Sequence, residues 1–96
     1  MIVAKLEKNS FESKITHRRT KEVTTYFSVK ITSFNYSDDI RDLAAKFSQE
    51  GFDGSLSFKC LTVRRVKGGD VLSLADFDRL VLAAFNKYAH TPSYIK

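Results

Sequence analysis

The longest uninterrupted β pattern in the sequence, Val23 to Phe34, constrains the fold more than any other stretch. β-branched and aromatic residues alternate along it with a period of two, so one side of the strand is expected to face a core and the other side solvent. Neither glycine nor proline interrupts the run, which favours a central position in a half-buried sheet. The side expected to face the core consists of Val23, Thr25, Phe27, Val29 and Ile31.

Two shorter β patterns precede this strand. Apolar and polar residues alternate over residues 2–6 and again over residues 11–18, with a turn at residues 8–10 between them. A polar loop without glycine, residues 17–22, then leads into the central strand. Three strands in this order predict an antiparallel meander.

An amphipathic helix is predicted after the central strand. Ile40, Leu43 and Phe47 fall on one helical stripe, with the spacing i, i+3, i+7. Ser37 is a suitable N-cap, and Gly51 suits the position just after the last turn.

A second helix is predicted from Leu74 to Tyr88, where apolar residues again recur at helical spacing. Ser73 and Asp76 resemble a capping box at its start, and Pro92 stops it.

Between the helices, residues 55–67 predict one further long strand, bracketed by Gly54 and by the pair Gly68-Gly69. Apolar residues occupy one phase of this strand up to Cys60 and the other phase after it. The phase change indicates either a β-bulge or burial of both faces at that point, and both interpretations remain open.

These elements predict an α+β fold of order β-β-β-α-β-α, a small mixed β-sheet with two helices packed on one face. A right-handed crossover through the first helix would place the fourth strand parallel to the central one. The basic cluster at residues 17–21 would then lie on the order of 30 to 35 Å from the basic cluster at residues 64–67, at the opposite end of the sheet. We therefore expect two separate basic sites and no single patch.

One domain accounts for all 96 residues, with residues 91–96 as a short C-terminal tail. A chain of this length buries a core without a disulfide or a metal, and its one cysteine, Cys60, is expected to be a small buried hydrophobe. Charges begin by the fifth residue, so no secretory signal is expected, and no apolar run is long enough to span a membrane. We expect a cytoplasmic protein.

No catalytic or metal-binding constellation is apparent, so we expect neither enzymatic activity nor a cofactor. His17, Cys60 and His90 stand in no motif, and their spacing does not suit zinc. Residues 12–14, Glu-Ser-Lys, are similar to the E-x-K part of metal-dependent nuclease sites, in which the Glu holds a metal and the Lys orients water. The partner Asp on a preceding strand is absent, which leaves a small metal-dependent nuclease as a remote alternative.

The sequence features that point to a binding function are its basic and aromatic residues. The net charge of +5 favours an acidic partner. Lys5, Lys14, Lys30 and Lys59 are expected to align on the solvent side of the sheet around Tyr26. Several modules bind single-stranded nucleic acid on a basic sheet with aromatic side chains that stack on the bases, although such sheets usually carry more than one aromatic residue. The candidate contact residues are Arg18, Arg19, Lys21, Tyr26, Lys30, Arg64, Arg65, Lys67 and Tyr94.

The sequence favours a small binding module over an enzyme. The first expectation is docking of the basic edges on an acidic surface of a larger protein, as inhibitors and adaptors do, with Tyr94 and Ile95 of the tail as a further anchor. The alternative is contact between the two basic clusters and the phosphates of nucleic acid. The chain is expected to be a monomer or, through an exposed edge at the first strand, a homodimer.

Overall fold

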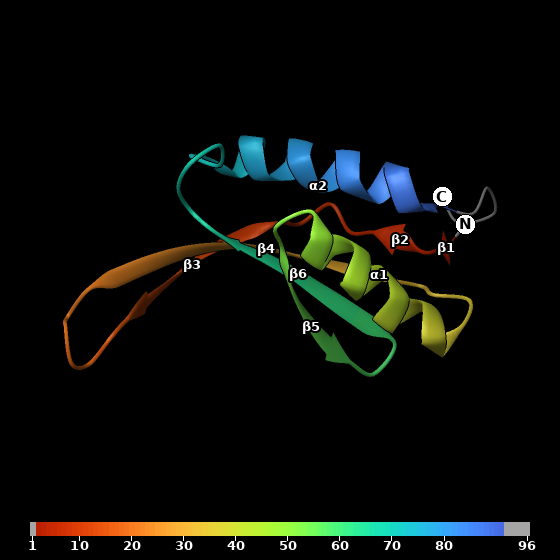
Figure 1. The fold of residues 1–96 in the computed structure, drawn as a ribbon, viewed down its shortest axis with the longest axis horizontal. Coiled ribbons are helices and arrows are strands. Elements are labelled where there is room, and N and C mark those ends of the chain that lie inside the picture. Colours follow the sequence, from red (N-terminus) through yellow and green to blue (C-terminus); the bar gives the residue numbers. More distant parts are fainter. Residues whose placement is uncertain (1, 92–96) are drawn as a thin grey trace.

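A computed structural model describes residues 2–91 and shows the expected α+β fold, with two helices on one side of a twisted sheet (Figure 1). The elements follow one another as β1 (Ile2–Val3), β2 (Lys5–Leu6), β3 (Phe11–Thr16), β4 (Val23–Thr32), α1 (Ser37–Gln49), β5 (Asp53–Ser57), β6 (Cys60–Val66), α2 (Leu74–Tyr88) and β7 (Ala89–His90). None of these helices is long and apolar enough to cross a membrane.

The predicted central strand, β4, is central in the structure. It pairs with β6 along one edge, while β3 and β2 lie end to end along its other edge. The predicted meander is wrong in one respect, because β2 pairs with the end of β4 at Ile31 and Thr32 instead of pairing with β3. The predicted first strand is also divided into two: β1 pairs in parallel with β7, whereas β2 pairs with β4.

Residues 55–67 form two strands where the sequence predicted one. Phe58 and Lys59 make a two-residue turn between Ser57 and Cys60, which are paired, and Lys59 has a left-handed φ of 56°. A two-residue turn shifts the alternation of inward and outward side chains. This turn, rather than a β-bulge or burial of both faces, therefore explains the phase change near Cys60.

The extra turn also reverses the direction of the strand beside β4. Tyr26 pairs with Val66 and Ile31 pairs with Leu61, so β6 runs antiparallel to β4 and the predicted parallel pairing is wrong. The crossover through α1 does return a strand parallel to β4, but that strand is β5 at the edge of the sheet. The intervening β6 is antiparallel to both.

The core lies between the helices and the side of the sheet that carries Phe27, Val29 and Ile31, as predicted, whereas Val23, also predicted to face the core, is 57% exposed. Phe77 of α2 is fully buried there, and its ring centroid lies 5.8 Å from that of Phe27 and 6.0 Å from that of Phe52. These three rings join α2, the central strand and the segment that follows α1.

Close packing of α1 on the edge strand depends on Gly54. A Cβ atom at this position would lie 3.3 Å from the Ala44 Cβ of α1 and 3.3 Å from Leu61 Cδ1. A glycine therefore lets the helix approach β5 closely.

The end of α1 is fixed by two backbone bonds. Phe52 N–H donates to Phe47 C=O over 3.0 Å and Gly51 N–H donates to Ser48 C=O over 3.1 Å, the pattern of a Schellman motif. Gly51 has a φ of 90°, as predicted for the residue after the helix end, and the Phe47 and Phe52 rings lie 5.4 Å apart. At the other end, Tyr36 occupies the N-cap without a side-chain bond, so the prediction of Ser37 as N-cap is wrong by one residue.

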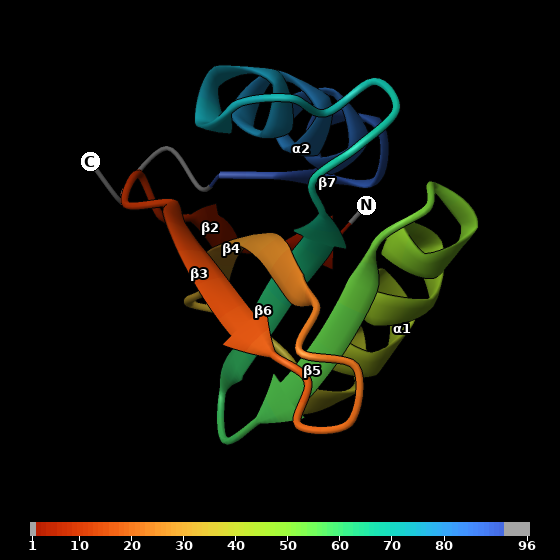
Figure 2. The ribbon, with the colours of Figure 1, turned by 90° about the vertical axis from the view of Figure 1, so that its left-hand side faces the viewer.

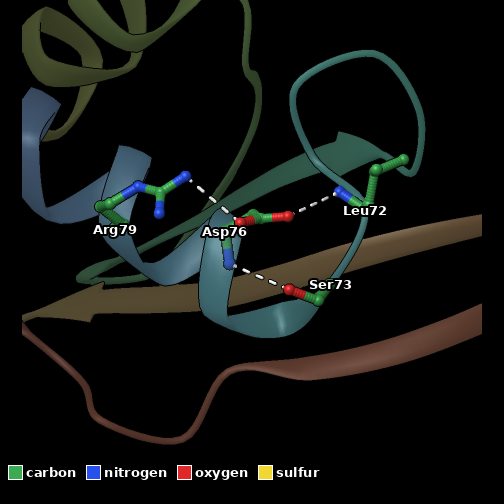
Figure 3. A network of polar contacts seen from close by, with 4 residues as sticks. All are labelled: Leu72, Ser73, Asp76 and Arg79. Atoms are coloured by element: carbon green, nitrogen blue, oxygen red, sulfur yellow. Dashed lines mark hydrogen bonds and ion pairs between the residues drawn. The ribbon is translucent and has the colours of Figure 1, made fainter.

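The start of α2 follows the prediction (Figure 3). The Asp76 N–H donates to Ser73 Oγ over 3.2 Å. The Asp76 carboxylate accepts bonds from the Leu72 N–H over 3.1 Å and from Arg79 Nη2 over 3.2 Å. These bonds fix the loop before α2 to the first turn of the helix.

Glu50 links the end of α1 to the end of α2. Its Oε1 accepts from Lys87 Nζ over 2.9 Å and from the Tyr88 hydroxyl over 2.7 Å. The hydrogen bond from Lys87 is the main reason, and that from Tyr88 the second, why the pKa of the Glu50 carboxyl lies below its ordinary value of 4.5. The same bond to Glu50 raises the pKa of Lys87.

Replacing Phe77 by Ala should remove the ring that joins the helices to the sheet. We expect Phe77→Ala to lower the free energy of unfolding by about 3–5 kcal/mol, the usual cost of deleting a buried phenylalanine ring. Leu82→Ala on the same helix is the control, since this side chain is 50% exposed and its loss should cost less than about 1 kcal/mol. Urea unfolding followed by circular dichroism measures both; equal losses would contradict the assigned core.

Acid should weaken the link between the two helices. Because the pKa of Glu50 is lowered by folding, its contribution is complete above the ordinary value of 4.5 and is lost as the pH falls through the folded-state pKa. The melting temperature of Glu50→Gln should therefore fall less between neutral and acidic pH than that of the parent. Glu12→Gln, at an exposed carboxylate of β3, should follow the parent curve; parallel curves for Glu50→Gln and the parent would refute the link.

Candidate binding surface

Within residues 2–91, the side of the sheet opposite the helices carries no covering element (Figure 2). Cross-strand partners in a sheet share a side, so the register assigns each side chain. We call this side the open face. It carries Phe11, Ser13 and Ile15 of β3, Thr24, Tyr26, Ser28, Lys30 and Thr32 of β4, Cys60, Thr62, Arg64 and Val66 of β6, and Asp53, Ser55 and Ser57 of β5.

Two aromatic rings and one arginine lie together near the middle of the open face. The guanidinium carbon of Arg64 is 4.6 Å from the centroid of the Tyr26 ring. Phe11 is opposite Ser28 and Tyr26 is opposite Ser13, so the two rings occupy diagonal positions on neighbouring strands. Phe11 is 47% exposed although it is apolar.

Short hydroxyl side chains hollow the sheet beside this group. A depression of about 280 Å³ is lined by Ser13, Ser28, Asp53, Gly54, Ser55, Thr62 and Arg64. The hydroxyl groups both donate and accept hydrogen bonds, and the Asp53 carboxylate accepts them. The depression therefore offers polar groups of both kinds next to the exposed Phe11 ring and the half-buried Tyr26 ring.

The two basic clusters lie at the same end of the sheet. Lys67 N–H donates to Thr25 C=O over 2.8 Å, which places the end of β6 beside the start of β4. Lys21 is four residues before Thr25, a span of about 14 Å for an extended chain. The prediction of clusters at opposite ends is therefore wrong, because it depended on a parallel strand.

Backbone bonds hold the cluster at residues 17–21. Lys21 N–H donates to His17 C=O over 2.8 Å, and His17 N–H donates to Glu22 C=O over 2.9 Å. Lys21 has a left-handed φ of 58°, and His17 Nε2 lies 3.1 Å from Thr24 Oγ1. Arg18 and Arg19 are exposed at the tip of this turn, where the β3–β4 hairpin projects beyond the helices (Figure 1).

Several predicted contact residues lie elsewhere. Arg65 points to the helix side, where its guanidinium carbon is 5.4 Å from the Phe52 ring centroid. Lys14 is opposite Thr25 and shares the helix side, so the predicted row of lysines around Tyr26 is wrong at this position. Lys30 is exposed on the open face as predicted.

Two further predicted residues are in the β5–β6 turn and in the C-terminal tail. Lys59 is in the β5–β6 turn, where its Nζ lies 5.2 Å from the Phe58 ring centroid, and it is not part of the row around Tyr26. Tyr94, with the proposed tail anchor, lies outside the described residues.

The basic clusters are available to bind anions. Within residues 2–91 the ion pairs are Arg79–Asp76 and Lys87–Glu50, and neither uses a residue of the clusters. Acidic groups also lie on the open face: Asp53 of β5 is directly opposite Arg64, and Glu7 follows β2 and accepts from Thr32 Oγ1 over 2.6 Å. The positive charge is therefore greatest at the end with the β3–β4 turn.

The structure does not bring a cysteine and a histidine together. His17 lies beside Thr24, whereas Cys60 is next to Leu61, the partner of Ile31, about 23 Å farther along β4. Cys60 is half-buried on the open face and not fully buried as predicted. His90 pairs with Val3 at the far side of the molecule.

The tripeptide at residues 12–14 has no partner for metal chemistry nearby. Glu12 and Lys14 are exposed on the helix side of β3. Among residues 2–91, no group of three or more His, Cys, Asp or Glu side chains is placed to hold a metal ion.

Sequence reasoning did not single out Phe11, Ser13, Ser28 or Thr62 as members of a candidate site. The alternation of residues 11–16 was visible, but only the hairpin register shows that Phe11 shares a side with Tyr26. Comparison with protein-family models, curated proteins and solved structures finds no match to the chain. Function is therefore inferred from the open face and the basic clusters.

Proposed function

We propose that the chain is a nucleic-acid-binding module whose basic clusters contact phosphates. The observation that carries this proposal is the antiparallel pairing of β4 and β6, which gathers both clusters at one end of the sheet. The phosphate-contacting residues are Arg18, Arg19 and Lys21 of the β3–β4 turn, Arg64 of β6 and Lys67, which follows β6.

The chemistry of these residues supports phosphate binding. Arg and Lys side chains contact phosphates without regard to sequence, and each contact releases a condensed counterion. Lys21 and Lys67 are at most about 14 Å apart along the strand, a distance that corresponds to up to roughly four phosphates of one duplex strand, at about 3.4 Å of axis per phosphate. Glu22 and Asp70 lie close in sequence to the clusters and moderate the charge, and the net charge of the chain is still +5.

Docking on an acidic surface of a larger protein is the second candidate. Ile15 and Val66, which are 43% and 44% exposed, lie on the open face, and Val66 is two residues from Arg64 on β6. Aliphatic side chains beside an arginine are typical of protein interfaces. A protein that docks through this surface would act as a small inhibitor or adaptor, and such a role requires no enzymatic activity.

Reversing two charges at the tip of the β3–β4 turn tests the first proposal. Fluorescence anisotropy with labelled DNA, titrated from about 50 to 300 mM salt, should give a log Kd that rises linearly with log salt for the parent. For Arg18→Glu/Arg19→Glu the slope should decrease by roughly 1.4, since each lost phosphate contact removes about 0.7 on a single strand.

The control is Lys8→Glu/Arg41→Glu, which changes the net charge equally at exposed positions away from the turn. It should retain most of the slope and affinity. Equal losses for both variants would show that only the overall charge matters. Absence of binding at the lowest salt would reject the proposal and leave the acidic protein surface as the first candidate.

A further inference from the structure

We propose that the open face is a stacking platform that selects single-stranded over duplex nucleic acid. Phe11 and Tyr26 supply the rings on which bases stack, and Arg64 extends the row of flat groups. This inference rests on the proposed function and adds to it the class of nucleic acid that is bound.

The positions of the two rings suit this role. They lie diagonally on neighbouring strands, and the side chains opposite them in the register are serines, Ser13 and Ser28. These small neighbours leave the Phe11 ring 47% exposed, whereas Tyr26 is half-buried with the Arg64 guanidinium over its ring. Base stacking on such aromatics tolerates any sequence, because every base has a π face.

Arg64 adds a third planar group beside the rings. Its guanidinium lies 4.6 Å from the Tyr26 centroid, close enough for a cation–π contact that holds the group over the ring. Bases stack on guanidinium planes as they do on aromatic rings. The positive charge also attracts the phosphate that joins two stacked bases.

The depression beside the rings can hold the edge of a base. Ser28, Thr62 and Ser55 bring hydroxyl groups to it, and Asp53 brings a carboxylate. The edges of unpaired bases carry both donors and acceptors, which these groups match. In a duplex the Watson–Crick edges are already paired.

The full width of the sheet is too large for the groove of a duplex. The open face is four strands wide, so its outer strands lie about 14 Å apart, which is three spacings of about 4.8 Å. The major groove of B-DNA is about 12 Å wide and admits a two-stranded ribbon, so the whole face does not enter it. The β3–β4 hairpin alone does fit the groove, and duplex binding by that route is the competing outcome.

Three probes of equal length separate these modes: labelled oligothymidine, the same deoxyribose-phosphate chain without bases, and duplex DNA. Measured by anisotropy, the parent should bind oligothymidine at least tenfold more tightly than either other probe, as expected from stacking of one or more bases. Phe11→Leu and Tyr26→Leu should each weaken oligothymidine binding on the order of tenfold and leave abasic binding unchanged.

Two variants serve as controls. Tyr26→Phe keeps the ring and should keep the affinity. Tyr36→Leu removes a tyrosine that is 71% exposed at the start of α1, away from the open face, and should also bind normally. Circular dichroism shows whether each variant is folded.

If a leucine variant does not fold, the test is made on the parent protein by nuclear magnetic resonance. The aromatic protons of Phe11 and Tyr26 should shift upfield when oligothymidine is added and should not do so with the abasic chain. Unshifted aromatic protons with bound oligothymidine would overturn the platform.

The affinities distinguish the two proposals. Equal binding of all three probes, or tighter binding of the duplex, overturns the platform while the phosphate-binding function stands. No binding of any probe at about 50 mM salt overturns both, because phosphate contacts are strongest there.

Discussion

The pairing of β4 with β6 determines both sides of this protein. In the observed register Val29 is opposite Val63 and Ile31 is opposite Leu61, so four aliphatic side chains enter the core together. The same register places polar and charged side chains on the other side, where Arg64 meets the Tyr26 ring. One set of backbone bonds thus positions the core and the candidate binding surface.

The two sides of the sheet have separate roles. Burial of Phe27, Phe77 and their neighbours between helices and sheet supplies the stability, and antiparallel sheets commonly leave their second face exposed. About half of the side chains on the open face are Ser or Thr, and these small groups leave Phe11 and Arg64 accessible. Substitutions on this face are therefore expected to cost little stability, which makes the proposed binding surface suitable for mutational tests.

The elements that the sequence predicted correctly are those fixed by local patterns. The alternation of β4, the stripe of α1, the Gly51 terminus and the Ser73–Asp76 start of α2 each depend on neighbouring residues. The turn at Phe58 and Lys59 was missed because it has none of the Gly, Asn or Asp residues that usually indicate a two-residue turn.

That missed turn accounts for the error in placing the two basic clusters. Without it, β6 was expected to run parallel to β4, and the basic clusters were placed at opposite ends. The register also decides which side of the sheet Lys14 and Arg65 occupy, and register is a property of strand pairs that no local pattern contains. The pairing of the strands therefore determines which of the predicted surface residues lie together, and the sequence alone does not contain this information.

Nuclear Overhauser contacts across β4 and β6 test the central claim most directly, and a chain of 96 residues suits the method. The antiparallel register predicts backbone contacts from Tyr26 to Val66 and from Ser28 to Arg64. Contacts from Tyr26 to Leu61, with none to Val66, would show that the strands are parallel, and the two basic clusters would then lie apart.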